Sequence, residues 1–237
     1  MVECNCHFLD TNIILAIILP NDGCKSESAE YFTKSNQKKY FSNTAFMEAK
    51  KVINNLRRVS LKIIACIKNY LTRNLINSKN VNNHFRKIKE LFLKRYQNDD
   101  FPENMKKENF VNVINNFFNE YAIEIKQILI DDKINELNTF LSHIKDAFKQ
   151  LHKDLINFSH HLICISFIIE NTKLNELIDI GIHKPDNILI NEAFVLSSVT
   201  NQIIVFVTFD KGILNYYDEI IELFSSKIHV LNPRVLL

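Results

Sequence analysis

Residues 6–19 read CHFLDTNIILAIIL, and this stretch decides the fold. A short apolar run, residues 7–9, meets the polar residues Asp10, Thr11 and Asn12 before hydrophobic residues resume. This pattern is typical of a strand that ends in a polar turn and continues as a helix. We therefore expect Asp10 to lie at the carboxyl end of a strand.

A second stretch, close to the other end of the chain, repeats this arrangement. Residues 203–210 read IIVFVTFD, which predicts a buried strand over 203–207 that ends at Thr208 and Asp210. If both strands belong to one parallel sheet, the two aspartates come to the edge at which open α/β sheets bind their ligands.

Two further acidic residues are expected near helix starts. A brief strand over 40–41 leads to a helix from about residue 45, capped by one of residues 42–44, with Glu48 close to its first turn. The sequence HKPDNILINEAFVLSSV, residues 183–199, predicts a helix that begins at a proline and carries Asp186 in its first turn.

The remaining elements follow from shorter patterns. Residues 26–35 predict a surface helix with a serine at its N-cap, residues 217–224 a late helix and residues 227–231 a final strand. Between about 60 and 170, apolar residues recur at three- and four-residue steps, which predicts amphipathic helices with breaks near 77–83 and 98–102.

Together these elements predict an α/β fold, with a parallel sheet flanked by helices and interrupted by a mostly α-helical insertion. We assign residues 1–60 and 170–237 to the sheet domain and residues 61–169 to the insertion. The chain has only 3 Gly and 4 Pro, which argues against a turn-rich all-β fold.

The cellular compartment of the protein is inferred from its cysteines and its apolar runs. The 5 cysteines are odd in number and scattered, and no basic region precedes the first apolar run, so we expect reduced thiols in a cytoplasmic protein. The longest apolar runs, residues 162–169 and 203–207, are too short to cross a bilayer, so no membrane partner is expected.

Charge is distributed unevenly along the chain. Residues 49–109 hold 15 Lys and Arg against 5 Asp and Glu, whereas the remainder holds 14 basic and 22 acidic residues. Such a basic segment is either a solvated helix face or a surface that contacts the phosphates of a nucleic acid. The residues expected to make such phosphate contacts are Lys50, Lys51, Arg57 and Arg58.

The acidic residues point to metal chemistry. Four carboxylates, those of Asp10, Glu48, Asp186 and Asp210, are expected to converge at one edge of the sheet, where they would repel one another. Hard divalent cations such as Mg²⁺ or Mn²⁺ prefer oxygen ligands and would relieve this repulsion. Two such ions can activate a water and stabilise the leaving oxygen of a phosphodiester.

This ordered set of residues resembles the PIN-domain family. The resemblance rests on Asp10-Thr11-Asn12, on Glu48, on Asp186 within KPDNILINEAF, on Thr208-Phe209-Asp210 and on the closing HVLNP, residues 229–233. It covers about residues 1–60 and 170–237. The family is built on a parallel α/β sheet and includes Mg²⁺- or Mn²⁺-dependent ribonucleases, many of them VapC-type toxins of toxin–antitoxin pairs.

The resemblance implies a metal-dependent endoribonuclease, with the four acids as catalytic and metal-binding residues. Asn12, Thr44 and Thr208 would orient ligands and water. It also implies RNA as substrate, a homodimer, and an antitoxin or other protein docking on the helical insertion.

Several alternatives stand beside this interpretation. Each aspartate could be an ordinary helix cap or first-turn acid, and Glu48 an ordinary helix residue. The chain could also be a catalytically silent PIN-like module that binds RNA or protein. An aspartyl-phosphate phosphatase is less favoured, because that chemistry wants a second aspartate where this chain has Asn12.

Overall fold

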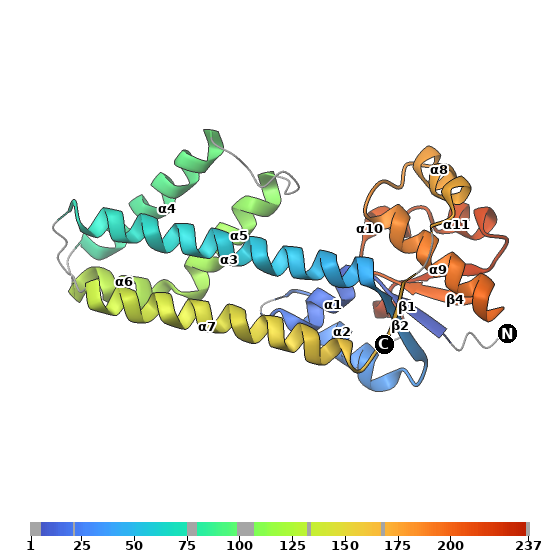
Figure 1. Cartoon of the computed structure of the whole chain (residues 1–237). Helices are drawn as coiled ribbons and strands as arrows, with labels where there is room; N and C mark the ends of the chain where they lie inside the picture. The colour runs from blue at the N-terminus through green and yellow to red at the C-terminus, as the bar shows by residue number, and fades with distance from the viewer. Residues whose placement is uncertain are drawn as a thin grey trace. The chain divides into compact units, whose positions relative to one another are not determined.

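The computed structural model describes residues 6–20, 22–74, 80–98, 107–131, 134–166 and 169–235 (Figure 1). The chain divides into two compact units, one formed by Met1–Lys51 and Leu151–Leu237, the other by Val52–Gln150. We call these the sheet unit and the helical unit. The chain crosses between them within α3 (Asn43–Leu71) and within α7 (Ile134–Ser159).

Five parallel strands form the centre of the sheet unit. Their order across the sheet is β3-β2-β1-β4-β5, and every neighbouring pair is parallel. The strands are β1 (Cys6–Leu9), β2 (Lys38–Ser42), β3 (Ile163–Ile165), β4 (Ile204–Val207) and β5 (Ile228–Leu231). The expected α/β fold with a parallel sheet is therefore confirmed.

Strands β1 and β4 have the apolar composition of strands in a sheet that is covered on both faces. All four residues of β1 and all four of β4 are buried. Phe8 and Phe206 stand in register on the two strands, and their rings stack with centroids 5.8 Å apart. Burial on both faces is usual for parallel strands, because helices cover each side.

The strand order reverses between β1 and β4. The chain proceeds from β1 through β2 to β3 on one side, and then returns to place β4 and β5 on the other side. In open α/β sheets, the carboxyl edge at such a reversal is the place where ligands bind. Leu9 pairs with Val207, so Asp10 and Thr208 are the first residues beyond the paired strands.

Helices and one 3₁₀ turn complete the sheet unit. They are α1 (Thr11–Ile18), α2 (Lys25–Lys34), α8 (Asn171–Asp179), α9 (Asp186–Thr200), α10 (Lys211–Leu214), α11 (Tyr217–Leu223) and the turn η2 (Pro233–Val235). The hydroxyl of Ser42 accepts a hydrogen bond from the Ala45 amide at 3.1 Å, so Ser42 serves as the cap of α3. The serine cap expected for α2 is wrong, because Cys24 occupies that position and its side chain makes no capping bond.

Strand β3 was not expected from the sequence. It lies within residues 61–169, which were assigned to helices, and it pairs with β2 through Phe41 and Cys164. The strand has only three residues, none of them buried, and it forms one edge of the sheet. The strand lies in the apolar run over 162–169, and a short continuous apolar run does not by its periodicity distinguish a strand from a helix.

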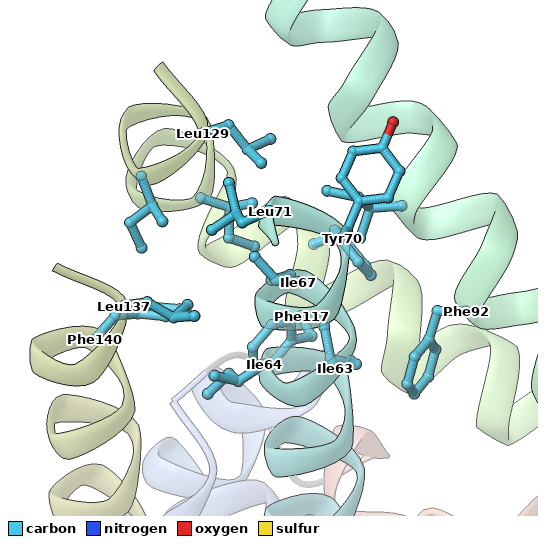
Figure 2. Close-up of a cluster of buried hydrophobic side chains, with 14 of the residues drawn as sticks. Ile63, Ile64, Ile67, Tyr70, Leu71, Phe92, Phe117, Leu129, Leu137 and Phe140 are labelled. Atoms are coloured by element: carbon cyan, nitrogen blue, oxygen red, sulfur yellow. The ribbon is translucent and has the colours of Figure 1, made fainter. Parts of the chain in front are cut away.

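The helical unit has a core of its own. Its helices include α4 (Val81–Asn98), α5 (Lys107–Glu120) and α6 (Ala122–Asp131), which pack with parts of α3 and α7. Figure 2 shows Ile63, Ile64 and Ile67 of α3 among aromatic and aliphatic side chains of the neighbouring helices. The helical spacing of Ile88, Phe92, Ile114, Phe117 and Phe118 matches their burial.

Of the expected helix breaks, residues 77–79 and 99–102 lie outside the described residues. The first break is placed too far along the chain, because residues 81–83 already belong to α4, which begins at Val81. Over the part of the chain that the structure covers, we find no helix with the length and apolar character needed to cross a membrane.

Two isoleucines of α7 that differ in burial allow a test of which positions of this helix pack into a core. Ile144 is 1% exposed, whereas Ile156 is 48% exposed. We expect Ile144→Ala to lower the free energy of unfolding by about 2–5 kcal/mol, because it removes buried methyl groups and leaves a cavity. Ile156→Ala is the matched control and should change it by less than about 0.5 kcal/mol. Urea unfolding followed by circular dichroism measures both, and equal losses would contradict the assigned packing.

Candidate active site at the carboxyl edge of the sheet

Asp10 lies where β1 ends and α1 begins, and it is only 3% exposed. Although it occupies the N-cap position of α1, its side chain makes no capping hydrogen bond to that helix. Its Oδ2 atom instead accepts hydrogen bonds from the Asn12 amide and from the Thr208 hydroxyl, each at 2.6 Å. The ordinary helix-cap interpretation therefore does not account for this carboxylate.

Thr208 and Asn12 join the ends of β1 and β4 around Asp10. The Thr208 hydroxyl accepts hydrogen bonds from the Asn12 amide at 3.0 Å and from the Asp210 backbone N–H at 2.9 Å, while it donates to Asp10. The Asn12 side-chain oxygen accepts from the Phe209 backbone N–H at 3.2 Å. Every hydrogen-bonding direction of the hydroxyl is thus used, which fixes the orientation of the Asp10 carboxylate.

The electrostatic surroundings of Asp10 are unfavourable to its charge. Burial raises the pKa of Asp10 from an ordinary value of 3.8 to about 7, against the hydrogen bond from Thr208, which lowers it. The charges of the nearby Asp186 and Glu48 carboxylates contribute to this rise, after burial. Two of the other acids singled out in the sequence, Glu48 and Asp186, therefore act on Asp10 through their charges.

Glu48 reaches this edge from the second turn of α3. Its Oε2 atom accepts a hydrogen bond from the Thr11 hydroxyl at 2.7 Å, which joins α3 to the segment after β1. Burial raises the pKa of Glu48, while the Thr11 hydrogen bond and the charge of Lys51 lower it. Thr11 belongs to the Asp10-Thr11-Asn12 motif, but the sequence assigns it no role, because a threonine at the start of a helix gives no sign of a partner 37 residues away.

Asp186 and Asp210 both lie at the start of a helix, but their interactions differ. Asp186 is the first residue of α9, and its charge acts on Asp10. Asp210 is exposed, and its Oδ1 atom accepts from the Gly212 backbone N–H at 2.6 Å as the N-cap of α10. The helix-cap interpretation thus describes Asp210, whose backbone is nevertheless held in the Asp10 network by Thr208.

Thr44 contacts a different acid from the four. Its hydroxyl donates to Oε1 of Glu192 at 2.8 Å, and Glu192 is 4% exposed on α9. Burial raises the pKa of Glu192. The pair joins the start of α3 to α9, so Thr44 helps to hold the two helices that carry Glu48 and Asp186. Its partner lies 148 residues away, a pairing that no local pattern indicates.

The basic residues expected to contact RNA all belong to α3 and are all exposed. Lys50 and Lys51 follow Glu48 after Ala49, and Arg57 and Arg58 come two turns later on the same helix. Residues seven apart lie on one face of a helix, which pairs Lys50 with Arg57 and Lys51 with Arg58.

The carboxylates of this edge suit a hard cation chemically, but they are not grouped around a single ion position. Among the residues that the structure describes, no three His, Cys, Asp or Glu side chains are grouped so that they could hold a metal ion. The atoms present are carboxylate oxygens, which Mg²⁺ and Mn²⁺ prefer. Two buried side-chain oxygens in the first two turns of α9, Asn187 Oδ1 and Glu192 Oε2, also accept no hydrogen bond within the described ranges.

Comparison of the chain with protein-family models, with curated proteins and with solved structures finds no match. The candidate site therefore rests on its residues and their geometry.

The raised pKa of Asp10 predicts a pH-dependent effect of Asp10→Asn on stability. An unfolded Asp10 loses its proton near pH 4, whereas the folded protein keeps it until about pH 7, so the carboxylate costs stability progressively as pH rises between these values. Asparagine retains an acceptor for Thr208 and Asn12 but carries no charge. We expect the variant to gain stability relative to wild type from pH 4 to pH 7, by at most about 4 kcal/mol.

Urea unfolding in the presence of EDTA at a series of pH values measures this difference. The matched control is Asp179→Asn, because Asp179 is exposed on α8. Its stability relative to wild type should stay flat over the same range. A flat difference for Asp10→Asn would show that Asp10 is not a costly buried carboxyl.

Proposed function

We propose that this chain is a PIN-like, metal-dependent endoribonuclease that hydrolyses RNA phosphodiester bonds at the carboxyl edge of its sheet. Asp10, Glu48, Asp186 and Asp210 are the proposed catalytic and metal-binding residues. The observation that carries this proposal is the buried Asp10 carboxylate, which lies where the strand order reverses and has Asp186 and Glu48 as its charged neighbours.

A carboxylate with acidic neighbours needs a counter-charge to stay ionised in a buried position. The alternatives are to remain protonated or to bind a cation. A divalent Mg²⁺ or Mn²⁺ ion held by these oxygens would supply that charge, lower the pKa of a bound water and offset negative charge on the phosphate. Asp10, together with the two acids whose charges act on it, Glu48 and Asp186, would hold this ion.

The surrounding residues have positioning roles in this proposal. Thr208 and Asn12 both bind Oδ2 of Asp10, which fixes the direction in which the carboxylate points. Thr11 restrains Glu48 in the same way. Hydrogen-bonded partners of this kind orient metal-binding carboxylates, and their loss usually costs about 10–100-fold in affinity or activity.

The basic face of α3 supports RNA as the substrate. Lys50 and Lys51 lie two and three residues after Glu48 on α3, so their phosphate contacts would be close to the acidic edge. Arg57 and Arg58 would add contacts on the part of α3 that belongs to the helical unit. Such contacts position a nucleic acid without reading its sequence.

The resemblance to the PIN family adds the remaining parts of the proposal. The five-stranded parallel sheet is compatible with the fold that this resemblance implies. By the same resemblance, the chain would act as a homodimer and as the toxin of a toxin–antitoxin pair, with an antitoxin or other protein bound to the helical unit.

A second candidate is a catalytically silent PIN-like module that binds RNA or protein. One observation favours it: within the described ranges, no three potential ligands are already grouped for a metal ion. The two candidates differ in whether divalent ions produce cleavage.

We expect the full-length chain to cleave labelled single-stranded RNA in Mg²⁺ or Mn²⁺, and not in EDTA. Asp10→Asn should reduce cleavage below detection, because the variant lacks the central carboxylate. Thr208→Val should reduce it by about 10–100-fold, because it only disturbs the orientation of Asp10. Gel electrophoresis of time courses measures all three proteins.

Asp179→Asn serves again as control and should cleave like wild type. Cleavage that persists in EDTA, or an Asp10→Asn variant as active as wild type, would rule out the metal-dependent reaction. RNA binding without cleavage in any divalent metal would support the silent module instead.

RNA binding should depend on α3 and on salt. In an Asp10→Asn background, Arg57→Ala with Arg58→Ala should weaken binding to single-stranded RNA. The slope of log affinity against log salt should also become shallower by about 0.7 for each phosphate that the removed guanidinium groups had neutralised. Fluorescence anisotropy at several salt concentrations measures both effects.

A matched double variant, Lys145→Ala with Lys153→Ala, removes two exposed charges from α7 and should leave the slope close to that of the background protein. Equal losses of affinity from both doubles would assign the binding to general positive charge, and not to α3.

A further inference from the structure

A second concave feature of the sheet unit lies away from the acidic residues. It is a pocket of about 550 Å³ lined by α2, the segment after it, β1, β4, β5 and the start of α11. This volume is in the range of small-molecule sites. Its aromatic and imidazole lining comes from His7, Tyr31, Tyr217 and His229.

The floor of the pocket is a row across three neighbouring strands. His7 pairs with Val205, and Val205 pairs with His229, so the three residues stand side by side in β1, β4 and β5. Paired residues of neighbouring parallel strands point to the same face of a sheet. Two imidazoles on a strand face that would usually be apolar are unusual in a parallel sheet, which is normally covered on both faces.

The hydrogen-bonding groups of this pocket are largely neutral. The His7 Nδ1 atom lies 2.6 Å from the Tyr31 hydroxyl, and burial, aided by the charge of Lys39, lowers the pKa of His7 to about 4. The Lys39 ammonium donates to the backbone carbonyls of Ser35 and Gln37 at 2.6 and 3.3 Å. Lys34, at the rim, forms an ion pair with Glu30.

Further polar groups in the lining have capacity for a ligand. The side chains of Asn36 and Gln37 line the pocket and each carry an amide donor and acceptor. Rings for stacking beside neutral donors and acceptors suit a planar, uncharged heterocycle better than an anion.

We propose that this pocket binds a nucleobase, with the rings of Tyr217 and His229 beside it and the amides of Asn36 and Gln37 reading its edge. Proteins that recognise single-stranded RNA use the same combination of tyrosine or histidine stacking and hydrogen bonds to base edges.

The sheet register relates this pocket to the acidic edge. Leu231 lines the pocket and pairs with Val207, which pairs with Leu9, the residue before Asp10. The pocket therefore extends to the last paired row of the sheet. In this respect the inference rests on the proposed function, because the bound base would belong to the RNA that is cut at that edge.

Binding of 2-aminopurine riboside to the full-length chain in EDTA tests the proposal. The chain has no Trp, so this fluorescent nucleoside can be excited without protein emission. We expect its anisotropy to rise with protein concentration, and adenosine to displace it. His229→Ala and Tyr217→Ala should each weaken binding by about tenfold, the effect usual for loss of a stacking ring. His161→Ala is the control, because His161 is exposed and does not line the pocket, and it should bind like wild type.

Tyr217 is 39% exposed, so its variant keeps the test valid if His229→Ala fails to fold. Three results would each overturn the proposal: no binding by wild type, equal binding by both pocket variants and wild type, or displacement by inorganic phosphate as effective as by adenosine. The probe has no phosphodiester and the buffer no metal, so loss of the nuclease proposal and loss of this one are distinguishable.

Discussion

The structure depends on keeping one carboxylate buried and oriented in a position where its charge is costly. Asp10 is held by hydrogen bonds from Thr208 and Asn12, while burial and the charges of Asp186 and Glu48 oppose its ionisation. If this residue had only a structural role, the folded protein would be more stable with an uncharged side chain at this position. Proteins depart from local stability rules mainly at functional sites, and the proposed function rests in part on this cost.

Sheet topology explains how this arrangement arises from distant parts of the chain. Asp10 and Thr208 are 198 residues apart, yet they meet because β1 and β4 are parallel neighbours with Leu9 opposite Val207. Open α/β sheets bind their ligands at such a reversal of strand order, which is where the proposed site lies. The pocket that contains His7 and His229 belongs to the same sheet, so catalysis and base recognition would share one rigid support.

The sequence predicted the parts of this site that depend on local patterns. The apolar runs before Asp10 and Asp210 indicated strands, and the parallel sheet then brought both strand ends to one edge. It did not predict β3, because a short apolar run gives no periodic signal that distinguishes a strand from a helix. Nor did it indicate the bonds from Thr11 to Glu48 and from Thr44 to Glu192, because each joins segments that only the folded chain brings together.

The central claim is that the carboxylates around Asp10 hold a hard divalent cation. Anomalous diffraction from crystals of the full-length chain soaked in Mn²⁺ tests it most directly. We predict an anomalous peak in contact with an Asp10 oxygen and with Glu48 or Asp186, and its absence from crystals of Asp10→Asn. A wild-type crystal with no peak at this edge, or with Mn²⁺ bound only elsewhere, would contradict the account.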